Sequence, residues 1–137
     1  MPIIDTDAEL ASLLRGARTV AVVGLSANPA RDSHRVARYL QAHGYEIIPV
    51  NPGVDVVLGV AAVADLGKIG RPVDIVNVFR RPEFLPAIAA EAVRAGARSL
   101  WMQFDTVNDL AARNADAAGM DVVADRCIMV EHRRLIA

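Results

Sequence analysis

TVAVVGLSANPARDSHRVARYL, residues 19–40, is the stretch that decides the fold. Its apolar, β-branched start predicts a strand, Gly24 predicts a sharp turn, and the polar residues after it predict a loop that leads into a helix. In such a unit the N–H groups of the loop and the positive end of the helix face whatever lies above the sheet. The stretch therefore indicates a phosphate-binding turn of the kind that nucleotide-binding proteins use.

The glycine pattern of this loop is incomplete. Dinucleotide-binding folds carry G-x-G-x-x-G at this point, and only the first glycine, Gly24, is present. Ser26 and Pro29 stand where the second and third glycines would be. This favours a nucleotide other than NAD as the ligand.

Composition narrows the class of protein. The 137 residues are 53% hydrophobic but only 4% aromatic, which is enough for one domain, residues 1–137, with an aliphatic core. A net charge of −1 offers no general attraction to nucleic acid or anionic lipid. The single cysteine, Cys127, excludes an internal disulfide, and no apolar run is long enough to span a bilayer. We expect a soluble, cytoplasmic protein.

Five short apolar runs alternate with amphipathic segments along the chain. The predicted strands are Thr19–Val23, Glu46–Val50, Asp74–Val78, Arg98–Met102 and Asp121–Val123. The predicted helices are Asp5–Arg15, a leading helix within residues 1–17, and Ser33–His43, Glu83–Ala95 and Val107–Ala118. Most of these strands are β-branched and continuously apolar, which is typical of parallel sheets covered on both faces. The expected fold class is α/β, a Rossmann-like three-layer sandwich with a mainly parallel five-stranded sheet.

Turn residues separate these elements. Gly44, Gly96 and Gly119 follow three of the predicted helices, where a left-handed residue commonly ends a helix. Residues 53–72 are less regular. They predict a short edge strand at Val56–Val60 and one or two helical turns at Val63–Ile69.

In a parallel α/β sheet the ligand binds at the carboxyl ends of the strands, near the point where the strand order reverses. This rule selects five loops, namely Gly24–Ser33, Asn51–Gly53, Phe79–Pro82, Gln103–Thr106 and Ala124–Cys127. We therefore look for functional residues in these loops.

The first loop contains several groups that suit a phosphate. Gly24 lets the backbone approach it closely, and the Ser26 hydroxyl and the Arg31 guanidinium can donate to its oxygens. The residues expected to shape the turn or cap the helix are Asn28, Pro29, and Asp32 or Ser33. The alternative is an ordinary capped turn that binds nothing.

The end of the second predicted strand also disfavours NAD. NAD-binding folds normally carry an acidic residue there, which holds the ribose diol. Here the strand ends in Asn51-Pro52, and the neutral Asn51 tolerates a nearby phosphate. The alternative is that Asn-Pro-Gly serves only as a turn.

Two adjacent arginines, Arg80 and Arg81, follow the third predicted strand. At a helix start they oppose the helix dipole, at a cost of about 0.3–1 kcal/mol per exposed charge. An anionic ligand would offset that cost, and Glu83 would do so if the pair is structural. Phe79, just before them, is expected either to contact an adenine ring or to pack in the core.

The remaining loops offer fewer candidates. Trp101 is expected to pack in the core, and Gln103 at the strand tip can hydrogen-bond a ligand amide or a ribose. Cys127 is either a redox-active thiol or a small buried apolar residue. The three histidines lack metal-ligand spacing, and the chain has neither a nucleophile elbow nor a P-loop lysine. No catalytic residue and no metal site is predicted.

Motifs spread along nearly the whole chain, from about Thr19 to Leu135, combine into a known pattern. They are Val22-Val23-Gly24-Leu25-Ser26, Pro29, Arg31, Ser33, Val36, Tyr39-Leu40, Gly44-Tyr45, Ile48-Pro49-Val50-Asn51-Pro52, Val73-Asp74-Ile75-Val76, Val78-Phe79-Arg80-Arg81-Pro82, Gly96-Ala97, Trp101-Met102-Gln103, Asp125-Arg126-Cys127 and Glu131. Together they resemble the stand-alone CoA-binding domain proteins, which are similar to the N-terminal domain of the succinyl-CoA synthetase α subunit.

This resemblance implies a Rossmann-like fold that binds coenzyme A or an acyl-CoA. It implies that the first loop holds the phosphates, that Asn51 and Pro52 lie on the adenosine side, and that residues 79–81 hold the adenosine and its phosphate. Residues 101–103 would face the pantetheine arm. The full set of expected ligand-binding residues is Gly24, Leu25, Ser26, Asn28, Pro29, Arg31, Ser33, Asn51, Pro52, Phe79, Arg80, Arg81, Trp101, Met102 and Gln103.

The chain departs from the family's pattern after Gln103 and after Cys127. Asp105 stands where the family usually has glycine, which adds a negative charge near the expected ligand. Ile128-Met129 replaces the usual Pro-Lys. These departures lie at the far end of the site from the phosphate-facing loops, which match the family's pattern well.

Three functions remain open at this point. The first is a non-catalytic carrier or sensor of CoA or an acyl-CoA. The second is a redox enzyme or sensor that uses NAD(P) or CoA together with Cys127, and the third is a protein-interaction module whose nucleotide site has decayed. The expected partner is a small nucleotide rather than nucleic acid or membrane, and domains of this size often form homodimers.

Overall fold

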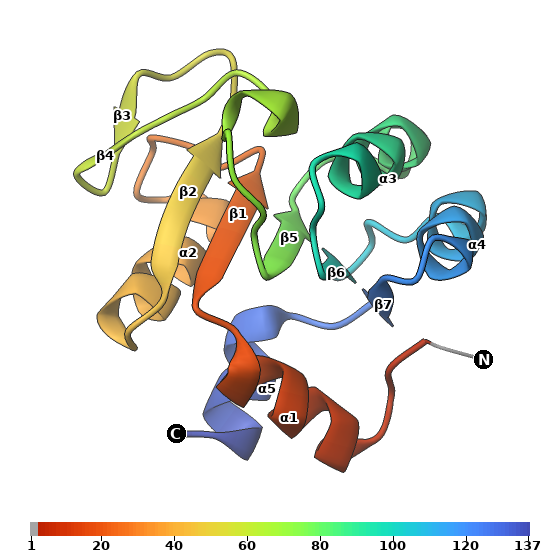
Figure 1. Cartoon of the computed structure of the whole chain (residues 1–137). Coiled ribbons are helices and arrows are strands. Elements are labelled where there is room, and N and C mark those ends of the chain that lie inside the picture. Colours follow the sequence, from red (N-terminus) through yellow and green to blue (C-terminus); the bar gives the residue numbers. More distant parts are fainter. Residues whose placement is uncertain (1–2) are drawn as a thin grey trace.

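The predicted alternation of strands and helices is present in the structure, a computed structural model that describes residues 3–137. In chain order the elements are α1 (Asp7–Gly16), β1 (Thr19–Val23), α2 (Asp32–Ala42), β2 (Glu46–Val50), β3 (Val56–Val57), β4 (Val60–Ala61), the 3₁₀ turn η1 (Leu66–Lys68), β5 (Ile75–Val78), the 3₁₀ turn η2 (Pro82–Phe84), α3 (Leu85–Arg94), β6 (Ser99–Met102), α4 (Asp109–Ala117), β7 (Asp121–Ala124) and α5 (Ile128–Leu135). Figure 1 shows their arrangement.

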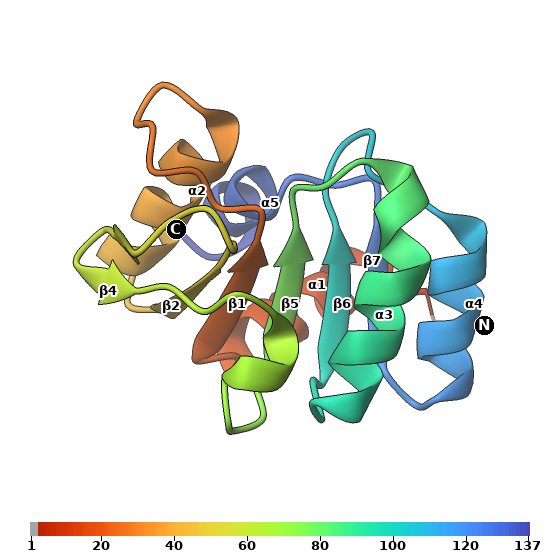
Figure 2. The same cartoon turned by 90° about the horizontal axis from the view of Figure 1, so that it is seen from above.

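Five of the strands form one parallel sheet in the order β2-β1-β5-β6-β7. The chain runs from β1 outward to β2 and then returns past β1 to β5, so the strand order reverses between β1 and β5. The last residues of these three strands, Val50, Val23 and Val78, are in register. Their loops therefore leave the sheet at one edge, toward which the arrowheads in Figure 2 point.

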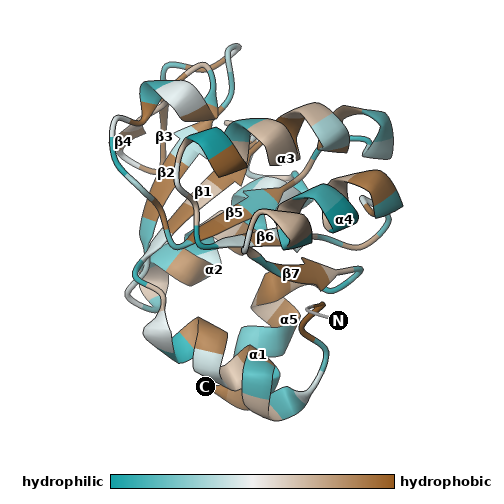
Figure 3. Cartoon of the chain, turned by 45° about the vertical axis from the view of Figure 1, so that its right-hand side comes forward, coloured by the Kyte–Doolittle hydropathy of each residue, from teal (hydrophilic) through white to brown (hydrophobic). Residues whose placement is uncertain are grey.

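Helices cover both faces of this sheet, as the two views in Figures 1 and 2 show. The α3 and α4 helices pack on one face through alanine-rich surfaces, and α1, α2 and α5 lie on the other. Neighbouring strand residues alternate between the two core clusters, so that Val22 faces α2 while Val23 faces α3. Figure 3 shows apolar strands between helices that carry both polar and apolar residues. The Rossmann-like α/β sandwich with five parallel strands is confirmed.

Local sequence signals account for most helix ends. Thr6 and Glu9 form a capping box at the start of α1, and the Asn108 side chain accepts a 3.0 Å hydrogen bond from the Ala111 N–H at the start of α4. Gly44 and Gly119 follow helices with φ near +90°, as expected for left-handed stops. In residues 3–137 no helix is both long and apolar enough to cross a membrane.

The irregular segment differs from its prediction. The expected edge strand at Val56–Val60 is instead a small antiparallel hairpin, β3–β4, which is separate from the main sheet. Leu58 and Gly59 both have positive φ at its turn, which suits a tight two-residue hairpin loop. The predicted helical turns at Val63–Ile69 shrink to η1, because Val63 pairs with Val50 in a parallel bridge.

Two helices also differ from the sequence prediction. The predicted helix at Glu83–Ala95 is divided into the 3₁₀ turn η2 and the α-helix α3. The last helix, α5, was not predicted at all, although it contacts α1 and α2 and buries Ile128 completely. It matters for function because it begins directly after the fifth strand-end loop.

Candidate functional site

The loops after β1, β2 and β5 are joined to one another where the strand order reverses. The Gly24 N–H donates to the Val50 carbonyl over 2.9 Å, and the Phe79 N–H donates to the Val23 carbonyl over 2.8 Å. The Asn51 side chain adds a 3.0 Å hydrogen bond from Nδ2 to the Leu25 carbonyl. The three strand tips therefore form one connected platform for a ligand.

Gly24 occupies a position that tolerates no side chain. Its φ is +85°, and a Cβ placed on it would lie 2.6 Å from the Phe79 carbonyl oxygen and 3.1 Å from Cδ of Arg80. A backbone atom cannot move aside as the tip of a side chain can. The sequence interpretation of Gly24 as the residue that permits this close turn is thus supported by the geometry.

The loop after Gly24 is held by its own polar side chains. Oγ of Ser33 accepts from the Ser26 N–H, Oγ of Ser26 accepts from the Asn28 N–H, and Oδ1 of Asn28 accepts from the Ala30 N–H, each over 3.0 Å. His34 Nδ1 lies 3.0 Å from the Ser26 carbonyl, and a carbonyl only accepts, so this nitrogen donates. These bonds preorganise the loop without a ligand.

The start of α2 differs from its prediction and leaves donors open. Its N-cap is Arg31, not Asp32 or Ser33, and no side chain caps it. The reason is that the Ser33 hydroxyl oxygen is already bonded to the Ser26 N–H. Within residues 3–137 the N–H groups of Asp32, Ser33 and His34 have no hydrogen-bond acceptor. An uncapped helix N-terminus of this kind is suited to an anion.

A cavity of about 500 Å³ lies over these donors. We call it the phosphate cavity, and it is lined by Gly24, Ser26, Ala30, Arg31, Asp32, Ser33 and Phe79. Arg31 is exposed and has no ion-pair partner among the described residues, whereas Asp32 pairs with Arg35 over 2.6 Å. Of the other residues expected in this loop, Leu25 is fully buried, and Asn28 and Pro29 are exposed outside the lining.

The two adjacent arginines have different surroundings. Both guanidinium groups lie over the Phe84 ring, Arg80 at 4.3 Å and Arg81 at 5.5 Å from its centroid. Arg81 also pairs with Glu83 over 3.9 Å. Arg80 has no ion-pair partner in the described part of the chain, and its stem lies against Gly24. Arg80 is therefore the cation better placed for an anion at this edge.

On the expected adenosine side, the Asn51 side chain is already hydrogen-bonded to backbone groups. Asn51 uses Nδ2 for the Leu25 carbonyl and Oδ1 for the Gly53 N–H, over 3.0 and 2.9 Å. Pro52 is exposed beside it. The turn alternative for this motif is thus present in the structure, and no acidic side chain replaces Asn51 at the tip of β2.

A second cavity, of about 280 Å³, shares Asp32 and Phe79 with the phosphate cavity. We call it the α5 cavity, and its lining is Asp32, Arg35, Val36, Phe79, Gln103, Phe104, Cys127, Met129 and Val130. Two of these residues, Met129 and Val130, lie on α5, a helix that was not predicted, and neither was expected to bind a ligand. Trp101 and Met102 have no exposed surface, so only their neighbour Gln103 reaches the cavity.

Gln103 is fixed by hydrogen bonds on one side only. Its Oε1 accepts from the Ile128 N–H over 2.8 Å and from Nδ2 of Asn77 over 3.3 Å. Because a peptide N–H only donates, the orientation of both amides follows, and Oδ1 of Asn77 is left buried without a donor. Nε2 of Gln103 has no hydrogen-bond partner in residues 3–137, although the side chain is 4% exposed.

Asp105 does not enter either cavity. It is exposed, and its N–H donates to Oδ1 of Asp125 over 3.2 Å. Its φ of +61° is one that glycine, the usual family residue, adopts without strain. The departure from the family pattern therefore changes the loop's backbone preference rather than the lining of the site.

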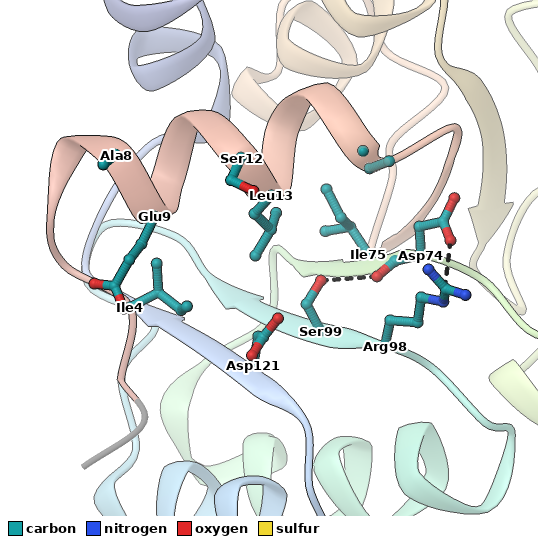
Figure 4. A pocket seen from close by; sticks show the side chains of 12 residues that line it. Ile4, Ala8, Glu9, Ser12, Leu13, Asp74, Ile75, Arg98, Ser99 and Asp121 are labelled. Carbon is teal, nitrogen blue, oxygen red and sulfur yellow. Dashed lines mark hydrogen bonds and ion pairs between the residues drawn. The ribbon is translucent and has the colours of Figure 1, made fainter.

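Another hollow, of about 480 Å³, lies between α1 and the amino-terminal ends of β5, β6 and β7 (Figure 4). Three of its polar residues, Asp74, Arg98 and Ser99, interact with one another. Ser99 Oγ donates to the Asp74 carbonyl over 2.7 Å, and the Asp74 carboxylate accepts from the Arg18 N–H and faces Arg98 at 3.8 Å. It lies at the end of the sheet opposite the strand tips. In residues 3–137 no three His, Cys, Asp or Glu side chains gather as a metal ion would need.

Comparisons with known proteins identify the family and the fold. The CoA binding domain family matches residues 18–133. The chain is 47% identical over 125 residues to the uncharacterized protein YneT of Bacillus subtilis (strain 168), covering 91% of this chain and 93% of that one. A solved structure from Thermus thermophilus superposes with a TM-score of 0.92 at 40% identity, over 96% of this chain and all of that one. A hypothetical protein from Pyrococcus horikoshii OT3 superposes with a TM-score of 0.94 at 36% identity, over 97% and 94% of the two chains.

Proposed function

The chain belongs to the CoA binding domain family, and from this membership we propose that it binds coenzyme A or an acyl-CoA at the tips of β1, β2, β5 and β6. The observation that carries the proposal is the phosphate cavity with its open donors. The uncapped start of α2 and the unpaired Arg31 line this cavity, and so does Gly24, whose turn leaves no room for a side chain.

Charge supports this ligand. CoA carries about four negative charges near neutral pH, on its diphosphate and its 3′-phosphate. Arg31 and the N–H groups of residues 32–34 are suited to the diphosphate, and Arg80 beside Gly24 is suited to a further phosphate. The proposed adenosine contacts are Asn51, Pro52 and Phe79, with Arg81 at the rim.

The pairing of cavities supports a ligand longer than a mononucleotide. The α5 cavity adjoins the phosphate cavity, and its lining is mostly apolar apart from Asp32, Arg35 and Gln103, which directly follows β6. The pantetheine arm would lie there. Contacts with the buried Leu25, Trp101 and Met102 would then come from backbone atoms.

We propose a carrier or sensor rather than an enzyme. In the described residues no hydrogen bond joins Cys127 to a histidine or a carboxylate, so the cavity lining holds no activated nucleophile of the usual kind. One observation favours a redox role as a second candidate: Cys127 lines the α5 cavity.

A thermal-shift titration in the presence of reductant tests the proposal. CoA and acetyl-CoA at millimolar concentration should raise the Tm. NAD at the same concentration should not, because no acidic residue at the tip of β2 can bind its ribose diol. Native mass spectrometry of freshly purified protein should show a CoA-sized adduct. No change in Tm with CoA or acetyl-CoA would defeat the proposal.

A further inference from the structure

We propose, resting on the proposed function, that Cys127 exchanges disulfides with the thiol end of bound CoA and holds it as a mixed disulfide. The two cavities set the direction of the ligand. Its phosphates occupy the phosphate cavity, and its arm passes Asp32 and Phe79 into the α5 cavity, whose lining includes Cys127. The thiol stands at the end of CoA farthest from the phosphates, so it is the group that comes to lie near this sulfur.

Gln103 gives an independent reason to expect a ligand in the α5 cavity. Gln103 is only 4% exposed, and its Oε1 accepts hydrogen bonds from two protein groups, the Ile128 N–H and Nδ2 of Asn77. Its Nε2 is left without an acceptor in the described residues, while the side chain lines the cavity. In those residues Oδ1 of Asn77 is the fully buried side-chain atom without a partner, so Nε2 of Gln103 keeps contact with solvent, and the amide carbonyls of the pantetheine arm can accept from it.

The surroundings of Cys127 suit a thiol partner. Val36, Phe79 and Met129 line the same cavity and supply apolar surface. The Cys127 side chain is 8% exposed, and its sulfur makes no hydrogen bond within residues 3–137. It is the single cysteine of the chain, so no second protein thiol can resolve the mixed disulfide.

The exchange is balanced when the co-reactant is the symmetric disulfide of CoA. The Cys127 thiolate attacks one sulfur of that disulfide, the sulfur–sulfur bond breaks, and a bond forms between Cys127 and one CoA. The second CoA leaves as a thiolate and takes up the proton that Cys127 released. One disulfide is consumed and one is made, so no further oxidant is needed.

The phosphate cavity should accelerate this exchange. A ligand held by its phosphates presents its disulfide to Cys127 at a high effective concentration, whereas a disulfide without those phosphates must collide from solution. The rate with CoA disulfide should therefore depend on Arg80, and the rate with glutathione disulfide should not.

Intact-protein mass spectrometry measures both rates. The protein, freed of reductant, is incubated with CoA disulfide or with glutathione disulfide at equal concentration. We expect the mass of the protein to increase by one CoA in mixed-disulfide linkage, at a rate at least tenfold higher than the rate at which glutathione adds. Dithiothreitol should remove the bound CoA. Cys127→Ser should gain no adduct, and Arg80→Ala should slow only the reaction with CoA disulfide.

Two outcomes would overturn the inference while leaving CoA binding intact. One is a wild-type protein that CoA stabilises under reductant but that CoA disulfide modifies no faster than glutathione disulfide does. The other is an adduct whose rate is the same in Arg80→Ala as in wild type. If CoA fails to stabilise the reduced protein, the proposed function itself fails.

Discussion

Nη1 of Arg126 donates a 2.7 Å hydrogen bond to Oε1 of Glu131, and this pair connects the loop after β7 to the first turn of α5. The second carboxylate oxygen of Glu131 accepts from Nε of Arg134 over 2.9 Å, and Arg134 also pairs with Asp7 in α1. The Glu131 side chain is 8% exposed. Through Arg134, the buried carboxylate of Glu131 therefore connects α5 to α1. Because α5 forms part of the wall of the α5 cavity, these contacts also hold that wall in place.

Replacing this carboxylate should destabilise the protein. Burial alone would raise the pKa of Glu131, but hydrogen bonds from Arg134 and Arg126 outweigh it and hold the pKa below its ordinary value. Glu131→Gln removes the charge and places an amide N–H₂ against a guanidinium group. We expect a loss of about 2–3 kcal/mol in the free energy of urea unfolding at pH 7.

The same pKa shift fixes the pH dependence of that loss. Because the folded pKa is lowered, the contribution of Glu131 is complete above its unfolded value of about 4.5 and is lost as pH falls through the folded pKa. The difference between wild type and Glu131→Gln should shrink below pH 4.5. Glu83→Gln is the matched control, because its ion pair is exposed and should contribute under about 0.5 kcal/mol. An unchanged difference at low pH would contradict the assignment.

The fold was predictable wherever one short pattern decides one element. The five strands of the main sheet are short and mostly apolar, and glycines end three of the helices, so both were expected from local sequence. The α5 helix was missed because it has no side-chain cap and is stabilised by distant partners, through the burial of Ile128 and His132 against the rest of the fold. The β3–β4 hairpin was misread because two-residue strands leave almost no periodicity.

A side chain at position 24 should cost more than one at another positive-φ glycine. Gly24→Ala places a Cβ 2.6 Å from the Phe79 carbonyl, in addition to the left-handed strain. Gly44→Ala meets the strain alone, since nothing lies within 4 Å of its Cβ. We expect about 1 kcal/mol for Gly44→Ala and about 3 kcal/mol or more for Gly24→Ala, measured by urea unfolding. Equal losses would mean that the loop relaxes around the new methyl group.

The two neighbouring arginines should differ in their effect on CoA affinity. Arg80 has no ion-pair partner in the described residues, whereas Arg81 pairs with Glu83. Arg80→Ala should therefore weaken CoA binding about tenfold or more in calorimetric titration, and Arg81→Ala should weaken it less. Arg113→Ala, on the exposed face of α4, is the control and should leave affinity unchanged. A larger loss for Arg81→Ala would reverse the assignment.

The candidate site could be located from the sequence, but the roles of its residues could not. Strand tips in a parallel sheet meet at one edge, so Gly24, Asn51 and Phe79 were expected together and are together. The sequence could not show that the Asn51 amide bonds the Leu25 carbonyl, or that Ser33 bonds the loop instead of capping α2. Each of these depends on the exact path of the loop, which residue types alone do not determine.

His132 should make stability depend on pH in a range where carboxylates do not titrate. Burial, and then the nearby charge of His43, lower the pKa of His132 below its ordinary value of about 6.5. A proton therefore favours the unfolded chain, so the stability that His132 contributes is complete above pH 6.5 and falls as pH drops toward the folded pKa. Urea unfolding of the wild type should show a decline between pH 7 and pH 5.

Two substitutions separate this titration from the packing around it. Nδ1 of His132 lies 2.9 Å from the Tyr39 hydroxyl, and its ring packs edge-on against Tyr39 and Tyr45. His132→Phe keeps an aromatic ring but cannot titrate, so it should flatten the decline, while losing about 0.5–1.5 kcal/mol at pH 7 with the hydrogen bond. Tyr39→Phe loses the same hydrogen bond and should keep the decline, because His132 remains buried. If the decline persists in His132→Phe, the assignment of the pH dependence to His132 is wrong.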